Sequence, residues 1–139
     1  MKAASIRVNY WAILVSAVAA FLLSYVWYSA FAEEMLRLHP LNPGTPAGMV
    51  RPPLWKMGAE VARDLILAFA LARLVRGLGI STWEAAVGLA VLLWAGFPLV
   101  LWAGTVIWQD SPVKLAAIHA GDWLLKLGLV TVIVAVWRR

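Results

Sequence analysis

Two long apolar segments of this chain each carry three ionisable residues, and this feature restricts the folds that the chain can adopt. The six are Glu60, Arg63 and Asp64 within residues 54–77, and His119, Asp122 and Lys126 within residues 113–137. A charge at bilayer depth costs several kcal/mol unless it is paired or hydrated, so such side chains face the protein interior. They also mark a candidate functional site by default.

The composition of the chain indicates whether these segments lie in water or in lipid. The 139 residues are 63% hydrophobic and 14% charged, with a mean hydropathy of +0.83, whereas soluble domains are roughly 45–50% apolar and about 25% charged. A transmembrane helix needs about 20 mostly apolar residues, so four such helices with their connections use the whole chain. We therefore expect an all-α fold, an integral membrane four-helix bundle in a single transmembrane domain, with the lipid bilayer as its surroundings.

The predicted spans are residues 10–31, 54–77, 83–108 and 113–137, with a proline-rich connection at 32–53. The first span also imitates a signal peptide that ends in Ala30-Phe31-Ala32, but its apolar run is longer than a usual signal sequence has, which favours retention. In the second span only eight uncharged residues separate Asp64 from Arg73, about 12 Å of helix. An interfacial or re-entrant helix is therefore the alternative there. Pro98 predicts a kink in the third span.

Basic residues predict the orientation. With four spans, the N-terminus, the connection near residue 78 and the C-terminus share one side, which carries six Lys or Arg against four on the other. By the positive-inside rule both termini are cytoplasmic, and we expect a bacterial inner-membrane protein. The net charge of +5 is then explained by the orientation of the protein in the membrane and by contact with anionic headgroups. No nucleic-acid partner is expected.

If spans two and four are neighbours, their ionisable residues fall at matching depths. We expect Glu60 to meet His119, Arg63 to meet Asp122, and Asp64 to lie near Lys126. Three carboxylates then face one arginine and one lysine, so the set is neutral only when His119 or one carboxyl binds a proton. We hypothesise one exchangeable proton shared by this set. The alternative is that the polar pairs only hold helices together, at about 0.6 kcal/mol each.

The first span adds further candidates. Ser24, Tyr25 and Tyr28 are placed to reach the polar set as hydrogen-bond donors. Ala12, Ser16, Ala20 and Ser24 recur every four residues, a small-residue stripe that favours close helix packing. Trp94, Trp102 and Trp123 lie deep in their spans; core packing is the favoured interpretation, and a pocket for an apolar or isoprenoid-like ligand is the alternative.

Motifs for catalysis or metal binding are not recognisable in the sequence. The chain has no cysteine and two histidines, His39 and His119, so a metal site built from several histidines is not expected. No catalytic residue is assigned, and an enzyme is the least favoured class. The cofactor is unknown. Tetrapyrrole ligation by His119 is an alternative, since Ala116, Ala117, Ala120 and Gly121 would let a flat ring approach.

Asn9-Tyr10, the apolar run and then Trp27-Tyr28-Ser29 with Phe31 resemble the opening of a bacterial family of small membrane proteins, the domain-of-unknown-function family 1761. The resemblance implies a four-span bundle and a retained first helix, and it brings no activity. We therefore expect a non-enzymatic accessory or small subunit of a larger membrane assembly, with other subunits or copies of itself as partners. The alternative is a binder or transporter of a small solute or lipid whose polar cluster is proton-sensitive.

Overall fold

The computed structural model describes residues 7–38 and 52–137, so most of the proline-rich connection lies outside the described part. The described chain is all-α, without a strand. Its helices are α1 (Tyr10–Ala30), α2 (Ala32–Leu38), α3 (Leu54–Gly77), α4 (Trp83–Gly96), α5 (Pro98–Gln109) and α6 (Val113–Val136). The predicted second span has the bounds of α3, and the first seven residues of the predicted connection, 32–38, are helical.

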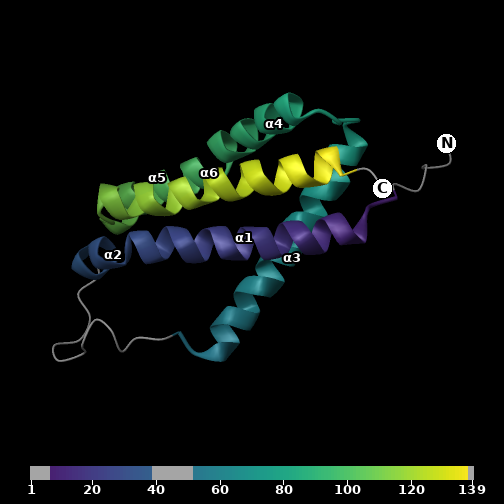
Figure 1. Cartoon of the computed structure of the whole chain (residues 1–139). Helices are drawn as coiled ribbons and strands as arrows, with labels where there is room; N and C mark the ends of the chain where they lie inside the picture. The colour runs from purple at the N-terminus through teal and green to yellow at the C-terminus, as the bar shows by residue number, and fades with distance from the viewer. Residues whose placement is uncertain (1–6, 39–51, 138–139) are drawn as a thin grey trace.

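Helix α6 is the centre of the bundle, because α1, α3, α4 and α5 all pack against it. Figure 1 shows α1 and α6 side by side, with α4 and α5 on the opposite flank of α6. The start of α1, the turn between α3 and α4 and the end of α6 lie at one end of the bundle. This arrangement agrees with the prediction that these three parts of the chain lie on one side of the membrane. Which side faces the cytoplasm stays a prediction.

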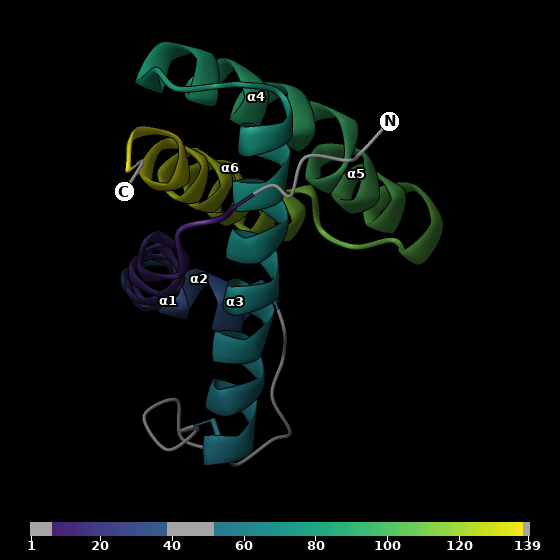
Figure 2. The same cartoon turned by 90° about the vertical axis from the view of Figure 1, so that its right-hand side faces the viewer.

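Helix α3 does not run parallel to the others. It crosses α1 and α6 steeply, as Figures 1 and 2 show from two directions. Its C-terminal half is buried at Asp64, Ala68, Leu71, Ala72 and Val75. Its first ten residues are exposed except for the half-buried Glu60, so this half projects from the bundle.

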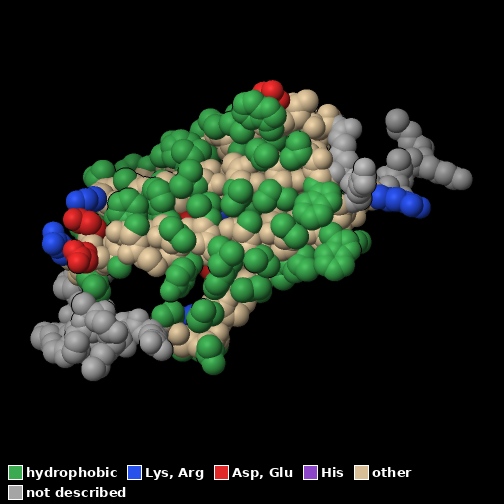
Figure 3. Space-filling view, in the orientation of Figure 1, with side chains coloured by type: hydrophobic (Ala, Val, Ile, Leu, Met, Phe, Trp, Pro, Cys, Tyr) green, Lys and Arg blue, Asp and Glu red, His purple; other side chains and the backbone are tan. Residues whose placement is uncertain are grey.

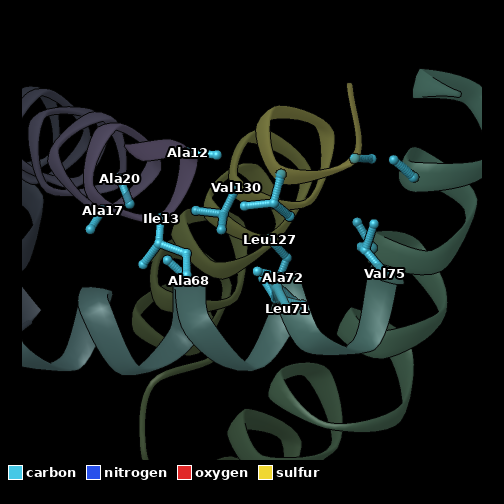
Figure 4. Packing of buried hydrophobic residues seen from close by; sticks show 14 residues of the cluster. Ala12, Ile13, Ala17, Ala20, Ala68, Leu71, Ala72, Val75, Leu127 and Val130 are labelled. Atoms are coloured by element: carbon cyan, nitrogen blue, oxygen red, sulfur yellow. The ribbon is translucent and has the colours of Figure 1, made fainter. Parts of the chain in front are cut away.

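Small residues make the steep crossing tight. Ala68 and Ala72 of α3 meet the small-residue face of α1 within one buried cluster (Figure 4). The predicted stripe on α1 is buried throughout, from Ala12 through Ser16 and Ala20 to Ser24, which confirms its role in packing. Without bulky side chains between them, the helix backbones approach closely and dispersion contacts accumulate.

Pro98 breaks the predicted third span into α4 and α5, as expected. The residue before it, Phe97, has left the helical region with φ −123° and ψ −79°, and Pro98 begins the next helix as its first residue. Proline has no N–H and its ring clashes with the preceding turn, so the helix changes direction here.

Among the residues that the structure describes, three helices are long and apolar enough to cross a membrane: Tyr10–Ala30, Trp83–Gln109 (α4 with α5) and Val113–Val136. Helix α3 is not among them, because Glu60, Arg63, Asp64, Arg73 and Arg76 interrupt its apolar surface. Hydrophobic side chains cover much of the outer face, and charged residues gather at the end that carries α2 (Figure 3). That surface is the one expected of a helical protein in lipid.

Candidate functional site: a buried charge cluster

Lys126, in the middle of α6, is surrounded by three carboxylates. Its Nζ lies 3.1 Å from Oε1 of Glu60, 3.1 Å from Oδ1 of Asp64 and 3.8 Å from Oδ2 of Asp122. Lys126, Asp64 and Asp122 are each only 2% exposed. We call Glu60, Asp64, Asp122 and Lys126 the charge cluster. Its members come from α3 and α6, at the place where these helices cross.

Helix α1 completes the surroundings of Asp122. Ser24 donates its hydroxyl to Oδ1 of Asp122 at 2.7 Å, and Tyr28 donates to Oδ2 at 3.4 Å. A hydroxyl donor stabilises the ionised carboxylate. Two of the three predicted contributors on the first span therefore reach the cluster. The third, Tyr25, is 64% exposed on the outer face.

His119 lies one helical turn before Asp122, beside the cluster. Its Nδ1 shares a hydrogen bond of 2.8 Å with the hydroxyl of Tyr28. Its ring stacks on the indole of Trp102, with 4.2 Å between centroids and 8° between planes. Tyr28 therefore connects His119 to Asp122, and through Asp122 to Lys126.

Two tryptophans fix the backbone of α6 at this level. Trp27 donates its indole N–H to the carbonyl of Ile118 at 2.9 Å, and Trp94 donates to the carbonyl of Ala120 at 2.8 Å. A buried indole needs such an acceptor. Gly121 makes room for the first contact, because a Cβ there would lie 2.7 Å from Cζ2 of Trp27. The flat ring that the small residues of α6 admit is thus an indole, in the place suggested above for a tetrapyrrole.

The predicted pairs are borne out in part. Asp64 lies against Lys126, as expected. Glu60, expected beside His119, pairs with Lys126 and Arg63, and His119 lies against Tyr28 and Trp102. These differences have one cause: the steep crossing of α3 brings the segment 60–64 to Lys126 instead of aligning the two helices residue by residue.

Arg63, expected at Asp122, forms an ion pair with Glu60 and has a side chain that is 62% exposed. It therefore stands at the rim of the charge cluster. The predicted six thus divide into four buried or half-buried residues in direct ionic contact, one rim arginine, and one histidine connected through Tyr28.

The charges of this region do not balance. Glu60, Asp64 and Asp122 supply three negative charges, whereas Lys126 and the rim residue Arg63 supply two positive ones. Oδ2 of Asp64 is buried and has no hydrogen-bond partner among the described residues. A buried charge is costly and an unpaired buried oxygen is costly, so a proton or a polar ligand at this place would relieve both.

At the end of the bundle, α2 is held by a separate ion pair. Glu34 contacts Lys114 of α6 at 2.8 Å and Arg37 at 3.6 Å. The hydrogen bond and the charge of Lys114 lower the pKa of Glu34. Glu34 lies outside the membrane-capable helices, and its contact with Lys114 in the first turn of α6 fixes the position of α2. Among the described residues, no group of three or more His, Cys, Asp or Glu is placed to hold a metal ion.

The fold and this site define an α-helical protein with helices long and apolar enough to cross a membrane and with an internal cluster of ionisable residues. The chain belongs to the family described as a protein of unknown function, DUF1761, whose model matches residues 11–135. That match confirms the resemblance seen at the first span. No curated protein and no solved structure matches the chain.

Proposed function

We propose that this protein is a small membrane-embedded binder or transporter whose ligand binding is coupled to protonation of the charge cluster. One observation carries the proposal: a buried lysine shared by three carboxylates, one of which has an oxygen without a partner in the described part of the chain. Membrane helices can associate through much weaker polar contacts than these buried ionic ones. Polar contacts between membrane helices contribute about 0.6 kcal/mol on average, whereas buried charges that are not fully compensated cost several kcal/mol.

Continuity of the polar groups supports a path for the proton. From Lys126 the contacts run to Asp122, from Asp122 to Tyr28 at 3.4 Å and from Tyr28 to His119 at 2.8 Å. The facing groups come from every helix that packs there: Ser24 and Tyr28 of α1, Glu60, Arg63 and Asp64 of α3, and His119, Asp122 and Lys126 of α6. Histidine titrates between about pH 5 and 8, so His119 is the group through which external pH reaches the cluster.

Infrared spectroscopy of the protein in lipid vesicles tests the protonation. A protonated carboxyl has its own C=O stretching band, which we expect to appear as the pH is lowered and to disappear in Asp64→Asn or Asp122→Asn. The matched control is Asp110→Asn, an exposed residue in the left-handed conformation that asparagine tolerates. A cluster whose carboxylates remain ionised across the range of histidine titration would contradict the proposal.

Ligand binding needs its own measurement. Native mass spectrometry of the protein released from membranes at two pH values detects retained small molecules directly. We expect a bound species whose occupancy depends on pH, and loss of that dependence in His119→Ala and Asp122→Asn without loss of fold. If both variants fail to assemble, the residues are structural.

A second candidate function, a subunit of an assembly, is favoured by the projecting half of α3. Leu54 and Trp55 are 85% and 69% exposed there, and the exposed Arg63 lies near the depth of Lys126. Although Arg63 pairs with Glu60, its side chain is 62% exposed, which is unfavourable in lipid, so a second copy or another subunit would cover it. Disulfide cross-linking of Ala59→Cys in native membranes tests this, because the chain has no cysteine of its own. A cross-linked dimer supports self-association, an adduct with a different chain that carries its own cysteine supports another subunit, and monomer alone contradicts self-association through this face.

We also propose that the protein resides in the cytoplasmic membrane with both termini inside. Single cysteines introduced at Gly79, in the turn after α3, and at Ser111, in the turn before α6, report the two sides. An impermeant maleimide added to intact cells should label the second and spare the first.

A further inference from the structure

An apolar groove runs along the bundle between α3, α5 and α6, beside the charge cluster. Its volume is about 810 Å³, which lies within the range of small-molecule pockets, roughly 300–1,000 Å³. The residues that line it are uncharged, and they include the three tryptophans Trp102, Trp108 and Trp123. An uncharged lining selects an uncharged occupant, because a charged group placed there would lose its hydration without gaining a partner.

The groove and the charge cluster share walls. Trp102 lines the groove and stacks on His119. Trp123 lines the groove, and Nζ of Lys126 lies 5.5 Å from the centroid of its ring. A cation is attracted to the face of an indole. The interaction of Trp102 with His119, and of Trp123 with Lys126, therefore depends on the charge of each partner. A molecule that contacts both indoles is therefore coupled to the cluster without touching it.

Polar groups are few in the groove, and they differ in character. The hydroxyl of Thr105 already donates to the carbonyl of Trp102 at 2.8 Å, so it offers its oxygen as an acceptor. Gln109 brings an amide, which has two N–H donors. Gly104, which also lines the groove, has no atom within 4 Å of the position of a Cβ, so the wall is open at that level.

We propose that this groove binds an uncharged lipid with a flat ring and a long apolar tail, the chemistry of a prenylated quinone. The ring lies against the indole walls, which favour stacked aromatic partners. A ring carbonyl accepts from the amide of Gln109, and the tail follows the leucines of α3. This inference names the ligand of the proposed binder or transporter and rests on that proposed function. Binding responds to protonation of the charge cluster through Trp102 and Trp123.

Saturable binding of tritiated decylubiquinone to the full-length protein in phospholipid nanodiscs tests the site. Gly104→Leu fills the groove without meeting the core and should weaken binding at least tenfold. The matched control is Gly88→Leu on α4, another glycine with open space around its Cβ position, outside the groove. Non-saturable partitioning that is equal in the two variants would overturn the proposal. So would displacement of the quinone by excess phospholipid, which identifies an ordinary acyl chain as the occupant.

The same assay separates this inference from the proposed function. Affinity should change with pH in the unaltered protein and become independent of pH in Asp64→Asn, with binding retained. Saturable binding that never depends on pH supports the quinone site and contradicts the proton coupling. A titrating carboxyl in the infrared spectrum without saturable binding supports the proton cluster and overturns the quinone site.

Discussion

Replacing Lys126 by methionine is the sharpest perturbation of the charge cluster. If the three contacts of Lys126 were ordinary polar adhesion, their loss would cost about 2 kcal/mol in total at about 0.6 kcal/mol each. Removal of one partner from a buried ionic group costs more, about 3–5 kcal/mol, because the remaining charges are left uncompensated. Methionine keeps the length and the apolar packing of the lysine stem, so we expect a loss of unfolding free energy in the higher range.

Reversible unfolding in mixed detergent micelles at neutral pH measures this difference. Lys56→Met, at an exposed position in the projecting half of α3, is the control and should change the unfolding free energy little. Adding Asp64→Asn to Lys126→Met removes one of the uncompensated charges, so the double variant should recover part of the loss. A loss of about 2 kcal/mol or less in Lys126→Met, or no recovery in the double variant, would refute the electrostatic account of the site.

Two further predictions concern packing and the end of the bundle. Gly121→Ala should destabilise the fold by about 1–3 kcal/mol, because the added Cβ meets the indole of Trp27 at 2.7 Å. The control is Gly128→Ala, whose Cβ position has no atom within 4 Å. It should leave the unfolding free energy unchanged in the same assay. The lowered pKa of Glu34 means that its contact with Lys114 stabilises α2 above the ordinary carboxyl pKa and is lost as the pH falls through the folded value. The protection of α2 against hydrogen exchange, corrected for the intrinsic exchange rate at each pH, should therefore fall in acid, and Glu34→Gln should remove that pH dependence.

Much of the fold could be predicted because its signals are local. Residues 54–77 form a helix with the predicted bounds, and Pro98 ends one helix and begins the next. Both features depend on residues that are close together in the sequence. The first follows from the length of the hydrophobic segment, and the second from a proline that has no N–H donor. Charge in an apolar segment is likewise visible in sequence, and it identified all four members of the charge cluster.

The relative placement of the helices could not be predicted in the same way. Whether two helices run parallel or cross depends on how two whole surfaces interdigitate, and the small residues Ala68 and Ala72 of α3 permit a steep crossing that no local pattern specifies. The partners of Glu60 and His119 follow from that crossing. The charged residues of α3, and not its course, explain why three helices of the described chain are long and apolar enough to cross a membrane rather than the four expected.

Gly121 illustrates a sequence signal that indicates a close contact without identifying the partner. A glycine among alanines on a charged helix indicates that something flat and large comes close. The structure places Trp27 there, and the indole N–H pins the carbonyl of Ile118 at 2.9 Å, one residue before His119. Trp94 pins Ala120 at 2.8 Å, one residue after it. Because α6 is held on both sides of His119, the imidazole is presented to Tyr28 and Trp102 in a fixed position. A change in its charge would then act at short range on Tyr28 and Trp102, and the proposed proton-coupled site requires groups held in place in this way.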